Sequence, residues 1–270
     1  MKIRSIPVGG GSPLVLFAGP CVVESREITL RTAEAVKKAA ARHGLGVVFK
    51  SSYAKANRTS GDSFTGIGAE KALAILREVR AALDLPVITD VHAEAEVPAA
   101  AEAADVLQIP AFLCRQTALL EAAGRSGRAV NIKKGQFLAP ADMAWAAAKV
   151  TATGNAAVLL TERGTTFGYH NLVVDMRSLV IMRGLGFPVI FDATHSVQLP
   201  GGGKGETGGE REFILPLARA AVAAGCDGLF LEVHPDPPRA LSDAASQLPL
   251  DELDALLAQV LAVDRAVRGR

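Results

Sequence analysis

The stretch GVVFKSSYAKANRTS, residues 46–60, sets a pattern that the rest of the chain repeats. Its first residues form a short β-branched run, which predicts a buried strand. Three cations follow directly, Lys50, Lys55 and Arg58, with hydroxyl side chains between them. Cations and hydroxyls at a strand end suit phosphate and carboxylate oxygens. Taken alone the cluster also fits a solvated basic loop, but its recurrence after other strands favours a cleft.

Strand-like and helix-like segments alternate on both sides of this stretch. We expect strands at residues 14–21, 46–51, 86–92, 106–110, 129–133, 156–161, 188–193 and 228–233, and helices at 27–43, 67–83, 94–103, 115–123, 141–151, 174–183, 211–224 and 250–267. Uniformly apolar strands, each followed by one helix, predict a closed parallel barrel. The predicted fold class is therefore α/β: a single (β/α)8 TIM barrel over residues 1–270 with a short N-terminal strand or hairpin extension. An open doubly wound sheet is the alternative, although no GxGxxG opens the first helix.

Composition narrows the classes of partner. The 270 residues carry a formal charge of +1 and only 21% charged side chains, which argues against a nucleic-acid-binding surface. The N-terminus has no apolar signal core, and no apolar run reaches the length of a membrane span. Cys21, Cys114 and Cys226 are scattered and odd in number, which favours a reducing compartment. We expect a cytoplasmic protein that acts on small molecules, without nucleic-acid or membrane partners.

Polar groups follow all the expected strands, and in such a barrel the functional groups come from the C-terminal strand ends. Asp90 and His92 are a candidate proton-transfer pair, because a carboxylate can orient an imidazole. A hydrogen-bonded strand-end pair without a catalytic role is the alternative. More cations are expected in one mouth than a single phosphate needs, which predicts two phosphorylated or carboxylated substrates. The six cations are Lys50, Lys55, Arg58, Arg115, Lys133 and Arg163.

A candidate metal site combines Cys21, His195, Glu232 and Asp243, which come from remote parts of the chain. A thiolate, an imidazole and two carboxylates suit a borderline divalent ion such as Zn²⁺, Fe²⁺, Mn²⁺ or Co²⁺. These four residues share no local motif. Taken singly, Cys21 also fits a small buried hydrophobe, and the two acids fit solvated groups or helix caps.

Several long strings carry a resemblance to a known family. They are FAGPCVVES, FKSSYAKANRTS, ITDVH, VLQIPAFLCRQT, VNIKKGQFLAP, TERGTTFGYHNLVVDMRSL and IFDATHSVQLPGG, and the match runs from about residue 15 to 249. Together they closely resemble the 3-deoxy-D-manno-octulosonate-8-phosphate synthase family. The resemblance implies a (β/α)8 barrel, usually a homotetramer, that condenses phosphoenolpyruvate with D-arabinose 5-phosphate and releases phosphate. That reaction leads to the inner sugar of bacterial lipopolysaccharide.

The resemblance also implies roles for individual residues. Phosphoenolpyruvate would be held by Lys50, Ser52, Lys55, Gln108, Lys133 and Arg163. Arabinose 5-phosphate would be held by Asn57, Arg58 and Thr59, the last two reaching across from a neighbouring subunit, together with Arg115. Cys21 stands where metal-independent members have Asn, which implies the metal-dependent form with Cys21, His195, Glu232 and Asp243 as ligands. The candidate catalytic residues are His195, Lys133, Arg163, Asp90 and His92.

Three other functions stay open at this point. A sister barrel would condense phosphoenolpyruvate with erythrose 4-phosphate. A Schiff-base aldolase would use Lys133 or Lys50 as its nucleophile. A non-enzymatic scaffold is disfavoured, because a barrel without a site has little reason to collect costly polar groups at the same end of every strand.

Overall fold

The computed structural model describes residues 1–57, 61, 63–202 and 207–269. Parallel strands that follow one another along the chain pair side by side, and β11 and β14 pair to close the barrel. The predicted closed barrel is therefore confirmed, and the open sheet is excluded. The barrel strands are β3 (Val15–Gly19), β4 (Gly46–Lys50), β5 (Val87–Asp90), β6 (Val106–Ile109), β7 (Ala129–Lys133), β8 (Val158–Glu162), β11 (Val189–Asp192) and β14 (Gly228–His234).

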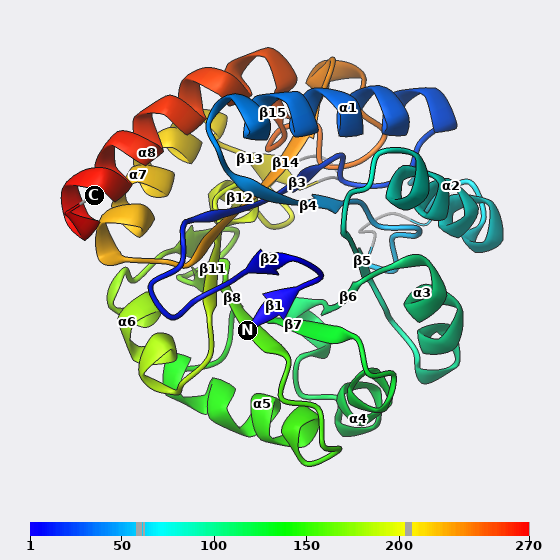
Figure 1. Cartoon of the computed structure of the whole chain (residues 1–270), viewed down its shortest axis with the longest axis horizontal. Helices are drawn as coiled ribbons and strands as arrows, with labels where there is room; N and C mark the ends of the chain where they lie inside the picture. The colour runs from blue at the N-terminus through cyan, green and yellow to red at the C-terminus, as the bar shows by residue number, and fades with distance from the viewer. Residues whose placement is uncertain (58–60, 62, 203–206, 270) are drawn as a thin grey trace.

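The helices form a ring around these strands (Figure 1). They are α1 (Arg26–Arg42), α2 (Ala69–Ala82), α3 (Val97–Ala103), α4 (Thr117–Arg125), α5 (Met143–Thr151), α6 (Arg177–Gly184), α7 (Ile214–Ala224) and α8 (Leu253–Arg268). Ser25 caps α1, because its Oγ accepts a hydrogen bond from the Ile28 N–H at 3.1 Å. Several expected helix starts are 3₁₀ turns instead, such as Pro140–Asp142 before α5 and Arg211–Phe213 before α7. None of the helices in the described ranges combines the length and apolar character that a bilayer crossing requires.

Two separate sets of buried apolar side chains hold the barrel together. Side chains that point outward from the strands pack against the helices. A smaller set inside the barrel, called here the bottom cluster, consists of Ile3, Val8, Val15, Phe17, Val48, Ile88, Val106, Ala129, Leu159, Ile190 and Phe230. The hairpin of β1 (Lys2–Ile3) and β2 (Ile6–Pro7) lies across the centre of the ring and contributes Ile3 (Figure 1). The expected N-terminal extension thus closes one end of the barrel.

The loops that follow the strands carry short pairings that the sequence did not predict. The strand β9 (Thr165–Thr166) pairs with β10 (Leu172–Val173), and β12 (Gln198–Leu199) pairs with β13 (Gly208–Gly209). The strand β15 (Leu248–Pro249) adds to the edge of β14. Two-residue strands are too short to show an alternating pattern, so periodicity cannot reveal them.

Candidate active site

The candidate site begins one layer above the bottom cluster. Side chains along a strand point alternately into and out of the barrel. The residue two positions after the last bottom-cluster residue of each strand therefore also points into the barrel. On every barrel strand except β3 this residue is polar and buried; β3 has Gly19, where an added Cβ would lie 2.0 Å from the carbonyl oxygen of Lys50. We call this set the polar layer: Lys50, Asp90, Gln108, Asn131, Thr161, Asp192 and Glu232.

The predicted metal ligands gather at one side of the polar layer. Candidate ligand atoms of Cys21, Glu232 and Asp243 lie within 4.8 Å of one another. The Cys21 Sγ is 3.0 Å from Asp243 Oδ2, and His195 Nε2 is 3.5 Å from Glu232 Oε1. Ser242 Oγ also lies 3.0 Å from the Cys21 sulfur. All four predicted ligands are therefore brought together by the fold.

Two features of this group fit a cation. Glu232 Oε2 is buried and has no hydrogen-bond partner among the described residues, which is costly for a carboxylate oxygen. Asp243 has a φ of +49°, a left-handed conformation that costs a side-chain-bearing residue free energy and is found at functional sites. The donor set of one thiol, one imidazole and two carboxylates meets the preferences of a borderline divalent ion.

The electrostatics of the group point the same way. Burial raises the pKa of the Cys21 thiol well above its usual value, and the charges of Asp243 and Glu232 raise it further. Burial also acts to raise the pKa of Glu232, but the positive charges of His195 and Lys50 hold it well below its usual value. A bound divalent cation would supply the positive charge that the thiol needs to ionise.

The lysines of the mouth are paired with carboxylates. The Lys50 ammonium donates to Glu232 and, at 2.8 Å, to the carbonyl oxygen of Cys21. Lys133 Nζ lies 2.6 Å from Asp192 Oδ2, and His195 Nδ1 lies 2.8 Å from the same oxygen. Asp192 was not among the predicted site residues, although its position three residues before His195 in the string DATH indicates a contact between the two.

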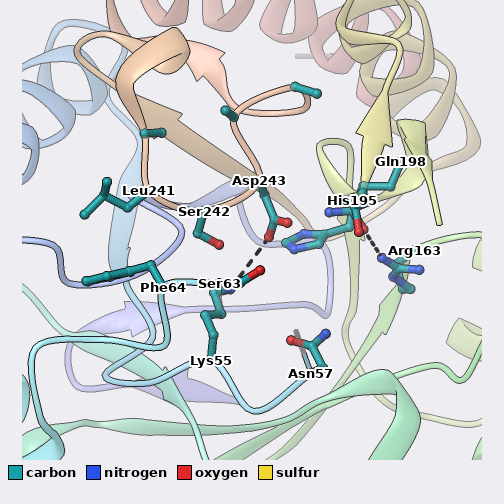
Figure 2. A pocket seen from close by; sticks show the side chains of 14 residues that line it. Lys55, Asn57, Ser63, Phe64, Arg163, His195, Gln198, Leu241, Ser242 and Asp243 are labelled. Carbon is teal, nitrogen blue, oxygen red and sulfur yellow. Dashed lines mark hydrogen bonds and ion pairs between the residues drawn. The ribbon is translucent and has the colours of Figure 1, made fainter. Parts of the chain in front are cut away.

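A cavity of about 300 Å³ lies above the polar layer (Figure 2). Lys55 projects into it with its Nζ 3.9 Å from Asp243 Oδ2 and 3.8 Å from Glu232 Oε1. Arg163 also lines the cavity and donates to Gln198 Oε1 at 2.7 Å, while its other terminal nitrogen is buried without a partner among the described residues. The predicted residues that line the cavity are Lys55, Asn57, Arg163, His195 and Asp243. Its walls thus offer an anion the unpartnered terminal nitrogen of Arg163 and the ammonium group of Lys55.

The predicted pairing of Asp90 with His92 needs a correction. The carboxylate within ion-pair distance of His92 is Glu96, whose Oε2 lies 3.3 Å from His92 Nδ1. Asp90 instead accepts hydrogen bonds from Ser52 Oγ and from the amide of Gln108. Glu96 sits in the 3₁₀ turn after β5, four residues beyond His92, a spacing that sequence analysis did not use.

A chain of hydrogen bonds fixes the orientation of the amides in the polar layer. Thr161 donates to Asn131 at 2.7 Å, Asn131 donates to Gln108 at 2.9 Å, and Gln108 donates to Asp90. Lys50, Lys55 and Lys133 hold the pKa of Asp90 below its usual value against the opposing effect of burial, so Asp90 is an acceptor. Since Ser52 donates its hydroxyl proton to the same carboxylate, it has no side-chain proton left for a substrate.

Of the remaining predicted substrate contacts, two fall outside the described residues and one lies in a different pocket. Arg58 and Thr59 are outside the described residues. Arg115 is exposed in a separate pocket beside Trp145 and Lys149, so it does not line the cavity of its own chain. Its contact with a neighbouring subunit's substrate stays a prediction.

Comparison with known proteins agrees with this geometry. The sequence model of the DAHP synthetase I family matches residues 1–268. The 2-dehydro-3-deoxyphosphooctonate aldolase of Syntrophotalea carbinolica is 58% identical over 269 residues, covering 100% of this chain and 97% of the relative. Proteins of the same name from Trichlorobacter lovleyi and Geobacter sulfurreducens are 56% and 55% identical over 268 residues, each covering 99% of this chain and 98% of the relative. The chain therefore belongs to the DAHP synthetase I family, and within it to the group of the 2-dehydro-3-deoxyphosphooctonate aldolases.

Proposed function

We propose that this chain condenses phosphoenolpyruvate with D-arabinose 5-phosphate and water to give 3-deoxy-D-manno-octulosonate 8-phosphate and phosphate, the reaction that leads to the inner sugar of lipopolysaccharide. The observation that carries the proposal is the full-length similarity to proteins named 2-dehydro-3-deoxyphosphooctonate aldolase. The cavity supports it, because Lys55 and Arg163 face a space large enough for small phosphorylated molecules.

In the proposed mechanism the cations first bring two anions together. Arg163 and Lys133 bind the phosphate that will leave, while Lys55 and Lys50 offset the remaining negative charge; otherwise the substrates would repel each other. The enol carbon of phosphoenolpyruvate attacks the sugar aldehyde, and water adds to the cationic carbon left behind. The resulting hemiketal phosphate collapses with cleavage of its carbon–oxygen bond and releases phosphate. We assign the transfer of a proton near Asp90 to His92, and the contact of its Nδ1 with Glu96 supports this assignment.

The proposal includes a divalent cation held by Cys21, His195, Glu232 and Asp243. Its support is the convergence of the four side chains and the unpartnered oxygen of Glu232. An ion held by these residues would supply Lewis-acid chemistry, by which the sugar aldehyde would be oriented and polarised. Zn²⁺, Fe²⁺, Mn²⁺ and Co²⁺ all suit these ligands. Which ion is bound therefore depends on the availability of each metal in the cell as well as on the ligands.

Assembly and location form a further part of the proposal. A homotetramer is supported by exposed large apolar side chains at Phe112, Phe137, Trp145 and Phe167, which a partner subunit would cover. The three cysteines are buried and free, in keeping with a reducing cytoplasm.

The Schiff-base alternative has less support. Its two candidate nucleophiles, Lys50 and Lys133, both lie against buried carboxylates, from Glu232 and Asp192. An ammonium group in such a pair has no lone pair with which to attack a carbonyl.

The test is steady-state turnover of phosphoenolpyruvate with arabinose 5-phosphate and, separately, with erythrose 4-phosphate. We expect turnover with the first sugar and at least a hundredfold lower kcat/KM with the second. Chelation should abolish turnover and metal add-back should restore it. Preference for erythrose 4-phosphate would contradict the proposed substrate, and full activity of metal-free protein would contradict the proposed ligand set.

A further inference from the structure

A buried ion pair lies directly behind the wall of the cavity that carries Arg163. Lys134 Nζ is 3.5 Å from Glu162 Oε1, and their side chains are 0% and 1% exposed. Neighbouring residues on a strand point to opposite sides, so Lys133 and Arg163 face the mouth while Lys134 and Glu162 face the helices. Each member of the pair is thus the immediate chain neighbour of a cation of the mouth.

Stability alone gives little reason for this pair. Residues that point outward from the same strands, such as Ile132 and Leu160, are apolar and pack against the helices. Removing two charges from water costs about as much as their attraction returns, and a well-packed apolar pair is often as stable. The charges of Lys134 and Glu162 therefore call for another explanation.

Glu162 holds the turn from which Arg163 enters the cavity. Its Oε1 accepts hydrogen bonds from the backbone N–H groups of Arg163 at 3.0 Å and Gly164 at 2.6 Å. Its Oε2 accepts one from Ser178 Oγ on α6 at 2.6 Å. Gly164 has a φ of +95°, so the chain turns sharply here. A single carboxylate thus fixes the backbone of Arg163 to both the turn and the helix behind it.

Lys134 connects this turn to the end of the neighbouring strand. Its Nζ donates to the carbonyl oxygen of Leu138 at 3.4 Å and to Thr165 Oγ1 at 3.0 Å, besides pairing with Glu162. The segment after β7 is thereby joined to the segment after β8. Since Lys133 and Arg163 stand at these two strand ends, the ion pair fixes their separation.

We propose that Glu162, neutralised by Lys134, is a positioning residue that aims Arg163 at the phosphate of phosphoenolpyruvate. It touches no substrate and acts through the backbone of Arg163. The inference rests on the proposed function, because it assigns a substrate group to Arg163. Its specific consequence is that loss of the carboxylate weakens binding of one substrate and leaves the other unaffected.

The test compares two double variants that both avoid an unpaired buried charge. Lys134→Met/Glu162→Ala removes the acceptor and should raise both the Kd of phosphoenolpyruvate, measured by calorimetry, and its KM at least tenfold. The KM of arabinose 5-phosphate should change less than threefold. Lys134→Met/Glu162→Gln keeps an oxygen for the two N–H groups, so its Kd and KM should stay within threefold of wild type.

A matched control separates positioning from general loss of stability. Asp105 is also a buried carboxylate that accepts from a backbone N–H, of Val87 at 3.0 Å, and from a cation, Arg80 at 2.9 Å, but it lies at the start of β6 and away from the mouth. The Arg80→Met/Asp105→Ala variant should lower the melting temperature and leave the Kd of phosphoenolpyruvate within twofold. An equal rise in Kd for this control would overturn the inference.

The outcomes also separate the inference from the proposed function. If wild type shows no turnover, the proposed function fails, while calorimetry with phosphoenolpyruvate and inorganic phosphate still tests positioning. If Lys134→Met/Glu162→Ala binds phosphoenolpyruvate as tightly as wild type, the inference fails and the proposed function stands. Should that variant not fold, Ser178→Ala removes a single bond to the same carboxylate. It should raise the Kd about threefold, and an unchanged Kd would refute the role of Glu162.

Discussion

At the scale of single residues, Asp90 shows how hydrogen bonds and nearby lysines stabilise a buried carboxylate in its ionised form. It receives the hydrogen bonds of Ser52 and Gln108, and nearby lysines lower its pKa although burial opposes them. The unfolded value is about 3.9. A depressed folded pKa means that the ionised carboxylate stabilises the fold above about pH 4, and that this stability is lost as the pH falls towards the folded value.

We therefore expect Asp90→Asn to lower the free energy of unfolding by about 1–3 kcal/mol at pH 7. At pH 3 the carboxylate of Asp90 is already mostly protonated in the unfolded chain. The loss of unfolding free energy caused by Asp90→Asn should therefore be about 1 kcal/mol smaller than at pH 7. Urea denaturation of metal-free protein at both pH values measures the difference. Glu94→Gln, at an exposed carboxylate in the same segment, serves as the control. An identical loss at pH 7 and pH 3 would show that the charge of Asp90 does not contribute.

Residue type and position in the sequence identify the residues of the site, but not the partners that these residues contact. Cys21, His195 and Glu232 were selected by residue type at strand ends and Asp243 as an acid of the last loop, and the structure brings them together. The pairing of His92 with Glu96 was not predicted. Asp90 and Glu96 are both close to His92 in sequence, and only the folded turn decides which carboxylate reaches the imidazole. The hydrogen-bond chain of the polar layer depends on strand register around the barrel, which no local motif encodes.

At the scale of secondary structure, the predicted strands and helices appear in order, and the errors lie at their ends. Helix starts expected at residues 141 and 211 are 3₁₀ turns, since both hydrogen-bonding patterns share similar periodicity over one turn. The close approach of the β3 and β4 backbones was also not predicted from the sequence. Their backbones approach so closely that Gly19 has no room for a side chain beside Lys50.

Gly19→Ala should separate β3 from β4. The added Cβ would lie 2.0 Å from the carbonyl oxygen of Lys50, which is backbone and cannot rotate away. Overpacking at a fixed backbone costs about 1–3 kcal/mol or more, so we expect at least 2 kcal/mol of destabilisation in urea. Gly184→Ala, in α6 with no neighbour within 4 Å of the added carbon, should be neutral or stabilising by up to about 1 kcal/mol. Equal stability of the two variants would contradict the close approach.

At the scale of the whole molecule, the apolar residues that stabilise the inside of the barrel and the residues of the candidate site lie at opposite ends. One end is closed by the N-terminal hairpin and filled by the bottom cluster, and the other end holds the polar layer and the cavity. Phe230 lies at the boundary between them, with Lys133 Nζ 4.2 Å from its ring centroid. Substitutions in the hairpin should therefore change stability without changing substrate binding.

Ile3→Ala tests this separation. Ile3 is 2% exposed and packs inside the barrel, so its truncation should lower the free energy of unfolding by about 2–4 kcal/mol. The KM values of both proposed substrates should stay within twofold of wild type at a temperature where the variant remains folded, because the cavity is bounded by other residues. Lys2→Ala, on the exposed side of the same hairpin, should change neither quantity. A rise in either KM for Ile3→Ala alone would mean that the hairpin shapes the mouth through the strands, and the two ends would then be coupled.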